Sequence, residues 1–387
     1  MIKAATALVI LVALAGCSSI GDIRQGLDSP ECDVRCDAAR SLGGLQSNEE
    51  TTTLLLKALE DPAPSVREGA ADSLVQLLSE HAAPAILQKV KAASEPAKLA
   101  VIGALARPGA GEQASALLGD MLAEKSNEIR LAAAKALRTS TSPAKRPILL
   151  NLWSHDPDEN VKAAALVSAS YPAVAARKDE ALMAAWRSVL ADCPELLSQP
   201  SFLCAVGDLR IAEASPMLLG MLDSPELKYL AVQSLGKVRS NEAVAALLKI
   251  LENNESWVMN KQVCQAIGRI RPASAAPVLA KLFVEAKPQT DKDTWDRTVF
   301  LTLAMSKIGG DEIFEAFASH ITDKNKREFS LFALHRMAGV QPVWVENYWL
   351  YTWSGIESEW RKWWAANKQA VAERLAKMAD EEFNGEE

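Results

Sequence analysis

Histidine is scarce in this chain, and the few histidines present form no catalytic arrangement. The sequence has 4 histidines in 387 residues, and none lies in an H-E-x-x-H or comparable motif. They are His81, His155, His320 and His335. The chain also lacks a Gly-x-Ser-x-Gly motif, and its glycine-rich stretch at 108–111 does not follow a predicted strand, as a dinucleotide-binding turn would. These absences predict a protein that is not an enzyme and holds no metal or other cofactor.

A surplus of positive charge is missing as well. Lys and Arg number 42 against 49 Asp and Glu, which gives a formal net charge of −7. Proteins that bind nucleic acid rely on Lys and Arg to neutralise phosphates, so we expect no nucleic-acid partner. The same balance argues against a polybasic attachment to anionic lipids.

Long apolar runs are missing beyond the N-terminus. A membrane-spanning helix needs about 20 apolar residues, so we expect no such helix in the body of the chain. At the N-terminus, Lys3 precedes a shorter uncharged apolar run from Ala4 to Leu14. A short basic start followed by such a run is typical of a secretory signal peptide.

The stretch Leu-Ala-Gly-Cys at 14–17 resembles the lipobox of bacterial lipoproteins. In that family the signal is cut before the cysteine, and both its thiol and the new amino group are acylated. More than one acyl chain gives stable anchoring to a membrane. The resemblance implies a signal peptide over 1–16, a lipidated Cys17 and a short tether over 17–21. The alternative is an ordinary signal peptide followed by an unmodified cysteine.

The residue after the cysteine bears on which membrane holds the protein. In Gram-negative lipoproteins, Asp at that position is the usual signal for retention in the inner membrane, and here it is Ser18. The resemblance therefore implies a protein of the cell envelope, lipid-anchored to the outer membrane and facing the periplasm if the host is Gram-negative.

Five cysteines remain after the lipobox: Cys32, Cys36, Cys193, Cys204 and Cys264. The export compartment permits disulfides, and an odd number leaves at least one cysteine unpaired. Proximity in the sequence makes Cys32 with Cys36, and Cys193 with Cys204, the candidate disulfides. The thiol form remains open for both pairs. Neither pair has a second Cys or His pair at zinc-finger spacing, so we expect no metal there.

A motif rich in alanine and leucine recurs through the chain. It consists of an aliphatic residue, a basic residue, an alanine three positions later and a leucine four positions after that, as in the segment 34–42. Its last core position falls at residues 42, 74, 105, 137, 169, 235, 267 and 334. The two long intervals each contain one degenerate copy, which gives about ten copies. A fixed period of this length is the signature of a repeat architecture.

Each copy is predicted to be two helices joined by a turn. An earlier apolar stretch with helical spacing precedes each motif, and turn residues such as Asp61-Pro62 and Asp156-Pro157 lie between the two stretches. Asp caps the free N–H groups of a helix, and Pro is favoured at the first helical position. No segment shows a strand pattern.

The repeat resembles the HEAT repeat, in the short form known from the phycobilisome lyase HEAT-like family. The resemblance covers residues 22–340 and implies an all-α fold, an α-solenoid of about ten helix-turn-helix repeats. The landmarks of tetratricopeptide and ankyrin repeats are absent. Lyase activity belongs to a few chromophore-attaching members of the family, and no residue of this sequence indicates that activity.

One position of the motif is basic in most copies, and acidic residues recur at the turns with the same period. Because the two recur together, we expect a structural ladder of ion pairs, and the alternative is a basic stripe for an anionic ligand. The basic residues are Arg35, Arg67, Arg130, Lys162, Lys228 and Arg327; the acidic residues are Asp28, Asp61, Asp156 and Asp223.

The C-terminal region departs from the repeat and is rich in tryptophan. Trp360, Trp363 and Trp364 share one face of a helix predicted from Glu357 to Met378. The whole set comprises Trp344, Trp349, Trp353, Trp360, Trp363 and Trp364.

This region, 341–379, is similar to the closing segments of other bacterial HEAT-like proteins. The last repeat of a solenoid needs a cap. We therefore expect Trp360 and Trp364 to face Leu331, Phe332 and Leu334. The alternative is an exposed aromatic surface for a partner protein or a glycan. Residues 380–387 are expected to form a frayed acidic tail.

These features together predict a lipid-anchored, non-enzymatic scaffold of the bacterial cell envelope. Its partner would be an envelope protein bound along the solenoid surface, because stacked repeats present extended surfaces for interaction. The alternative is an envelope enzyme, or a protein that handles a cofactor or glycan, with a site at the Trp-rich end or near Cys193 and Cys204.

The lipobox assignment can be tested at Cys17. Replacing the acylated thiol by a hydroxyl, Cys17→Ser, should leave an unlipidated precursor that no longer partitions into detergent. Phase partitioning and the mass of the N-terminal peptide measure both effects. A Cys17→Ser protein that matures and stays in the membrane like the wild type would contradict the assignment.

Overall fold

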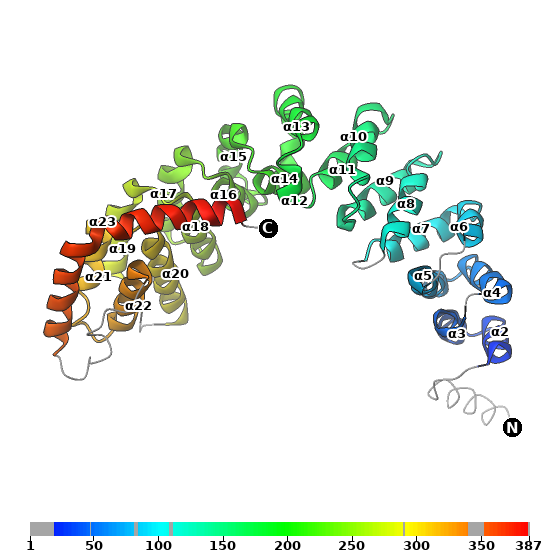
Figure 1. Cartoon of the computed structure of the whole chain (residues 1–387), viewed down its shortest axis with the longest axis horizontal. Helices are drawn as coiled ribbons and strands as arrows, with labels where there is room; N and C mark the ends of the chain where they lie inside the picture. The colour runs from blue at the N-terminus through cyan, green and yellow to red at the C-terminus, as the bar shows by residue number, and fades with distance from the viewer. Residues whose placement is uncertain are drawn as a thin grey trace. The chain divides into compact units, whose positions relative to one another are not determined.

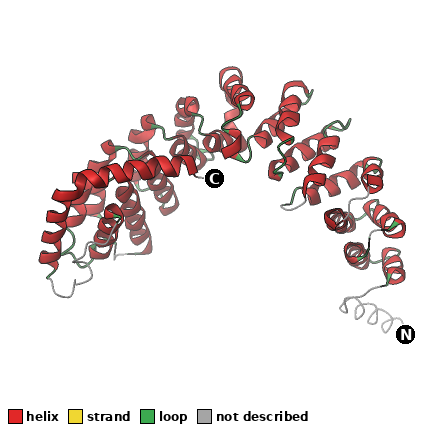
Figure 2. Cartoon of the chain, in the orientation of Figure 1, coloured by secondary structure: helices red, strands yellow, loops and turns green. Residues whose placement is uncertain are grey.

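A computed structural model describes residues 19–46, 48–80, 84–107, 111–288, 291–339 and 352–385. These residues form helices joined by turns and contain no strand (Figure 2). None of the helices within these ranges is both long and apolar enough to cross a membrane. The chain divides into two compact units, Met1–Ala176 (unit 1) and Arg177–Glu387 (unit 2).

The described part of unit 1 contains five consecutive helix pairs, in which the first helix is called A and the second B. The A helices are α2 (Ile20–Leu27), α4 (Glu49–Leu59), α6 (Pro84–Lys91), α8 (Gly111–Met121) and α10 (Lys145–His155). The B helices are α3 (Cys32–Ser41), α5 (Pro64–Glu80), α7 (Glu95–Leu105), α9 (Asn127–Ala136) and α11 (Glu159–Ala169), and the short α12 (Ala173–Ala176) follows them.

Unit 2 continues the pattern and adds one long helix. Its A helices are α13 (Glu180–Asp192), α15 (Ser215–Gly220), α17 (Val244–Asn253), α19 (Ala276–Glu285) and α21 (Asp311–Ala318). Its B helices are α14 (Pro200–Leu209), α16 (Lys228–Val238), α18 (Trp257–Ile270), α20 (Lys292–Ile308) and α22 (Arg327–Ala338), followed by α23 (Trp353–Gly385). The predicted solenoid of about ten helix-turn-helix repeats is therefore confirmed.

Short 3-10 helices extend or connect several of these elements. They are η1 (Leu42–Gly44), η2 (Leu137–Thr139), η3 (Pro194–Ser198), η4 (Ala212–Ala214), η5 (Met221–Asp223), η6 (Asn241–Ala243) and η7 (Ala273–Ala275).

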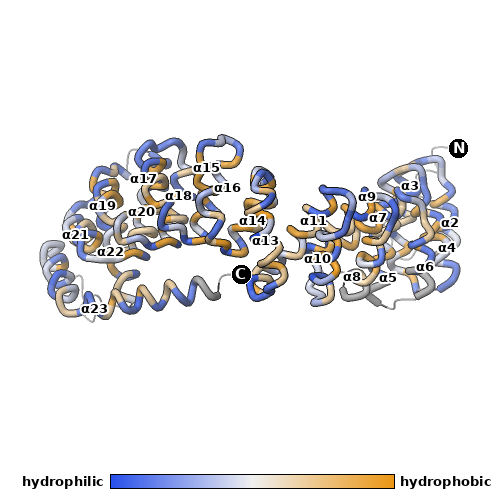
Figure 3. The backbone as a smooth tube through the Cα atoms, turned by 90° about the horizontal axis from the view of Figure 1, so that it is seen from above, coloured by the Kyte–Doolittle hydropathy of each residue, from blue (hydrophilic) through white to orange (hydrophobic). Residues whose placement is uncertain are grey.

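The A and B helices form two layers within each unit (Figure 1). Successive B helices pack directly against one another, whereas most successive A helices touch each other less. The motif alanines explain the difference, because Ala70, Ala133 and Ala231 are fully buried and their short side chains let neighbouring helices approach closely. The B layer therefore lies on the inner side of the curve in each unit. Apolar and polar stretches alternate along the helices (Figure 3), as one-sided burial requires.

Arginine–aspartate pairs join successive repeats in unit 1. Arg35 donates from Nε and Nη2 to the two carboxylate oxygens of Asp61, at 2.8 and 3.1 Å. Arg130 binds Asp156 in the same way, at 2.7 and 3.0 Å, and also donates to the carbonyls of Glu124 and Lys125. Each arginine thus ties the turn before its own helix to the turn of the next repeat.

The predicted ladder is confirmed at Asp61 and Asp156 and corrected elsewhere. Lys228 pairs with Glu255 instead of Asp223, because the acid of the following turn lies in reach. Asp28 pairs with Lys57. Three further basic side chains bind the turn or helix of their own repeat. Arg67 donates to the carbonyls of Asp61 and Pro62, Arg327 to those of Ile321 and Thr322, and Lys162 to Glu159.

Of the two forms that the sequence leaves open for the candidate pairs, the structure has the thiol form. Cys32, Cys36, Cys193, Cys204 and Cys264 are all thiols. Cys32 and Cys36 lie on the same helix and both sulfurs contact Ser65 of the next repeat, at its hydroxyl and its carbonyl. Cys193 ends α13, whereas Cys204 lies inside α14. Burial raises the pKa of Cys264 to about 12, so this thiol is inert.

The buried Arg130–Asp156 pair should contribute more to the stability of unit 1 than the exposed Lys57–Asp28 pair does. Asp156→Ala leaves the Arg130 guanidinium buried without its carboxylate, which should lower the free energy of unfolding by about 3–5 kcal/mol. Lys57→Ala removes a pair whose side chains are 53% and 60% exposed, and should cost less than about 1 kcal/mol. Urea denaturation followed by circular dichroism measures both losses. Similar losses for the two variants would show that the ladder does not hold the repeats together.

Candidate interaction surfaces

The C-terminal helix α23 closes the end of unit 2 with its tryptophans. Trp360 is fully buried, and its ring meets the ring of His335 edge to face at a centroid distance of 5.2 Å. Trp363 packs against Trp360 in the same manner at 5.6 Å and is half-buried. Burial beside the indole lowers the pKa of His335.

Trp364 joins α23 to the repeat before it. Its ring stacks on Phe314 at a centroid distance of 4.5 Å, and its Nε1 donates to Oδ1 of Asp311 at 2.7 Å. Lys368 also binds Asp311, at 3.0 Å. The hydrogen bonds from Trp364 and Lys368 hold the pKa of Asp311 below its usual value. The first half of α23 is therefore fixed by both apolar and polar contacts.

The structure corrects the expected position of Phe332 beside these rings. Trp360 and Trp364 face His335 and Phe314, whereas the side chain of Phe332 points away and is 51% exposed. The reason is that α23 approaches the face of α22 that carries His335. Cys17, Trp344 and Trp349 lie outside the described residues.

The second half of α23 turns and runs back along the C-terminal ends of the B helices (Figure 1). Arg239 donates to the carbonyl of Ala379 at 2.6 Å, and Arg271 donates to the carbonyl of Leu375 at 2.7 Å. Glu382 accepts from Arg271 at 2.7 Å and from Lys307 at 3.0 Å. Residues 380–385 therefore continue the helix, and the expected frayed acidic tail is wrong over these positions, because these cations bind the helix here.

The B helices of unit 2 end at residues with positive φ, and several of these residues meet α23. Each of the B helices α14, α16, α18 and α22 ends at a residue in the left-handed region, and α20 ends at a residue with positive φ. The residues are Arg210, Arg239, Arg271, Gly309 and Gly339. Glycine stands where α23 comes closest: a Cβ on Gly309 would lie 2.6 Å from Leu375, and one on Gly339 would lie 2.5 Å from Arg374. Arginine in this conformation is strained by about 1 kcal/mol, and at Arg239 and Arg271 the hydrogen bonds to α23 offset part of that cost.

A cleft of about 730 Å³ remains beside the second half of α23. Its walls are largely apolar and come from Ile270, Ile308 and Ala276 on one side and from Val371 and Leu375 on the other. The small side chains of α23 that line it are Ala372, Ala376 and Ala379. The helix thus covers this groove without filling it.

Large aromatic side chains are exposed at positions on four successive B helices of unit 2 and at the start of α23. Trp257 is 46% exposed, Trp295 is 40% exposed, and Trp295 leans edge to face on Phe329 at 4.7 Å. The Arg327 guanidinium lies 3.8 Å above the Trp353 ring. The set, called the aromatic row below, consists of Tyr229, Trp257, Trp295, Phe332 and Trp353.

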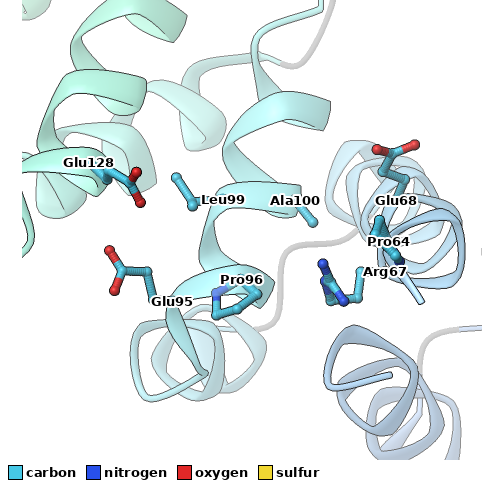
Figure 4. Close-up of a pocket in the computed structure, with 8 residues that line it drawn as sticks. All are labelled: Pro64, Arg67, Glu68, Glu95, Pro96, Leu99, Ala100 and Glu128. Carbon is cyan, nitrogen blue, oxygen red and sulfur yellow. The ribbon is translucent and has the colours of Figure 1, made fainter. Parts of the chain in front are cut away.

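Unit 1 contains a further pocket, of about 460 Å³, between α5 and α7 (Figure 4). Arg67 and Glu68 line one side of it, and Glu95, Glu128 and Leu99 line the other. These three glutamates are exposed and lie on successive B helices. The pocket holds no nucleophile paired with a base, so its chemistry is that of a polar recess.

Metal chemistry finds no support in the described residues. Within them, no three His, Cys, Asp or Glu side chains lie close enough to hold a metal ion. The candidate surfaces for binding a partner are the aromatic row and the edge of unit 2 that α23 contacts. Sequence analysis identified Trp353 among the first, but it missed Trp257 and Trp295, whose equivalent places at the starts of adjacent B helices were the available signal.

Comparisons with known proteins agree with this architecture. HEAT repeats match residues 21–106, 83–170 and 215–294, which together make up more than half of the chain. A search of curated proteins finds no significant match.

Several solved structures are similar to the chain. YibA of Escherichia coli is 19% identical, with 57% of this chain and 81% of that chain covered and a TM-score of 0.37. The Kap95:Nup1 complex gives 14% identity, 88% and 50% coverage and a TM-score of 0.47. The complex of CpcE and CpcF of phycocyanin lyase from Nostoc gives 16% identity, 84% and 96% coverage and a TM-score of 0.23. Because every TM-score is below 0.5, these likenesses say nothing about function.

The segments matched by the HEAT repeats contain helices of both layers. These segments fall in both units and cover the buried alanines Ala70, Ala133 and Ala231. The chain therefore belongs to the HEAT-repeat family.

Proposed function

We propose that this protein is a lipid-anchored, non-enzymatic scaffold of the bacterial cell envelope that binds a partner protein through the aromatic row of unit 2. The lipobox-like stretch at 14–17 supports the anchor, and the HEAT repeats support a role in protein interaction. The observation that carries the proposal is the exposure of large aromatic side chains on adjacent helices. A soluble surface rarely gathers such side chains without a binding role.

Aromatic side chains suit a protein interface for physical reasons. Trp and Tyr bury large areas at little cost in conformational entropy, and they dominate the energetics of many interfaces. On adjacent B helices, which pack about 8–10 Å apart, Trp257 and Trp295 would contact one continuous partner surface.

Charge supports a protein partner over a nucleic acid. The basic residues of the motif are engaged within the solenoid, as the pairs of Arg35, Arg130 and Lys228 show. They form no free basic stripe for phosphates, and the net charge of the chain is −7.

The aromatic row predicts which variants lose the partner. Trp257→Ala should reduce affinity about thirtyfold, the equivalent of about 2 kcal/mol for a central interface residue, while the unfolding free energy changes by less than about 0.5 kcal/mol. In-cell crosslinking followed by purification from envelope fractions measures capture. Lys249→Ala, at an exposed position of the A layer, is the matched control. Equal capture by both variants would refute the aromatic row as the binding surface.

The cap tryptophans should behave in the opposite way. Trp360→Ala deletes a fully buried ring and should lower the unfolding free energy by about 3–5 kcal/mol. Thermal denaturation of Trp360→Ala and Trp257→Ala side by side measures the contrast. A stable Trp360→Ala protein that loses its partner would move the binding surface to the Trp-rich end.

A further inference from the structure

The two halves of α23 are held to unit 2 in different ways. The first half buries Ile356, Trp360 and Trp364, each less than a tenth exposed. The second half buries only two apolar side chains in its described positions beyond Lys368, Val371 and Leu375. Free energy from apolar burial is roughly proportional to area, so the second half is bound much more weakly than the first.

Polar contacts provide the rest of the attachment of the second half. Arg239 and Arg271 donate to main-chain carbonyls of α23, which any helix offers in the same place. Glu382 bridges Arg271 and Lys307, so one carboxylate serves two cations. Burial alone would raise the pKa of Glu382, but the hydrogen bonds from Lys307 and Arg271 hold it below its usual value. The groove therefore recognises a helix with an acidic side chain at this position.

The fit between the second half of α23 and its groove is incomplete in two independent respects. The cleft of about 730 Å³ lies where α23 carries Ala372, Ala376 and Ala379, so larger side chains would find space there. The side chain of Arg271 is 8% exposed, lines this cleft, and its buried Nε has no hydrogen-bond partner among the described residues. A buried donor without a partner costs free energy that a better ligand would recover.

We propose that this groove, formed by the C-terminal ends of α16, α18 and α20, is a docking site for an acidic amphipathic helix of a partner protein, and that the second half of α23 occupies it as an exchangeable internal ligand. The partner helix presents apolar side chains larger than alanine at the places of Ala372 and Ala376, and an acidic side chain at the place of Glu382. The first half of α23 remains in place as the cap. This docking site is separate from the aromatic row and does not depend on the lipid anchor.

The chain itself supplies the probe for this site. A fluorescent peptide of residues 369–385 is added to the full-length protein, in which the groove is occupied, and to Leu375→Asp, in which a carboxylate replaces the leucine that packs on Gly309. We expect Leu375→Asp to bind the peptide at least tenfold more tightly than the wild type. Lys377→Asp, at an exposed position on the same helix, should bind it as the wild type does.

Two further measurements identify the groove as the binding site. Adding Arg271→Ala to Leu375→Asp should weaken peptide binding at least tenfold, because the donor to the helix carbonyl and to Glu382 is lost. A peptide carrying Ala376→Leu should bind several times more tightly than the native peptide, because the leucine enters the cleft. Hydrogen exchange should show amides 371–385 released in Leu375→Asp while amides 356–366 stay protected.

Three outcomes would overturn the proposal. One is equal peptide affinity for wild type and Leu375→Asp when exchange shows the second half released. Another is the loss of amide protection throughout α23 in Leu375→Asp, which would show that the two halves of the helix unfold together as one structural element. The double variant Leu375→Asp with Glu382→Lys would have to lose protection throughout α23 as well. The third is a wild-type dimer that exchanges α23 between copies, which would assign the groove to a second copy of this chain.

Discussion

Each repeat of this protein can bury its apolar face only against the next repeat, and the rest of the structure follows from that constraint. The motif alanines bring the B helices together, and the Arg35–Asp61 and Arg130–Asp156 pairs fix the turns of successive repeats relative to each other. A stack built in this way has an unburied face at its end. The fully buried Trp360 and the Trp364–Phe314 stack cover that face at the end of unit 2.

The same constraint decides where a partner can bind. The inter-repeat layer uses the small and aliphatic side chains, and the turns use most of the motif's charged ones. Two surfaces are left for recognition. One is the solvent-exposed face of the B helices, which carries Trp257 and Trp295, and the other is the edge formed by the C-terminal ends of the B helices. At that edge, strained arginines at Arg239 and Arg271 reach the main chain of α23. Recognition at the edge depends on hydrogen bonds and charge, whereas recognition on the B helices depends on aromatic area.

The period of the motif was enough to predict the fold, because every copy repeats the same local contacts. It also predicted the pairs at Asp61 and Asp156, where the acid and the base of successive repeats lie within reach of each other. It failed at the C-terminus, where the partners of α23 lie far away in the sequence. No local pattern reveals that Glu382 meets Arg271 and Lys307, so the sequence predicted a frayed tail over residues 380–387. The state of the cysteine pairs stayed open for a related reason, since closeness in the sequence says nothing about the direction of a side chain on a helix.

The return of α23 changes the cooperativity of unit 2. Its bonds join residues separated by 140 positions at Arg239–Ala379 and by 104 at Arg271–Leu375, whereas the Arg130–Asp156 pair of unit 1 spans 26. An array with neighbour contacts alone behaves as a one-dimensional chain that can fray repeat by repeat. A strap across several repeats couples their unfolding and raises the contact order, which slows folding. During synthesis, unit 1 can therefore consolidate as it emerges, while unit 2 reaches its final stability only after the last residues of the chain have been made.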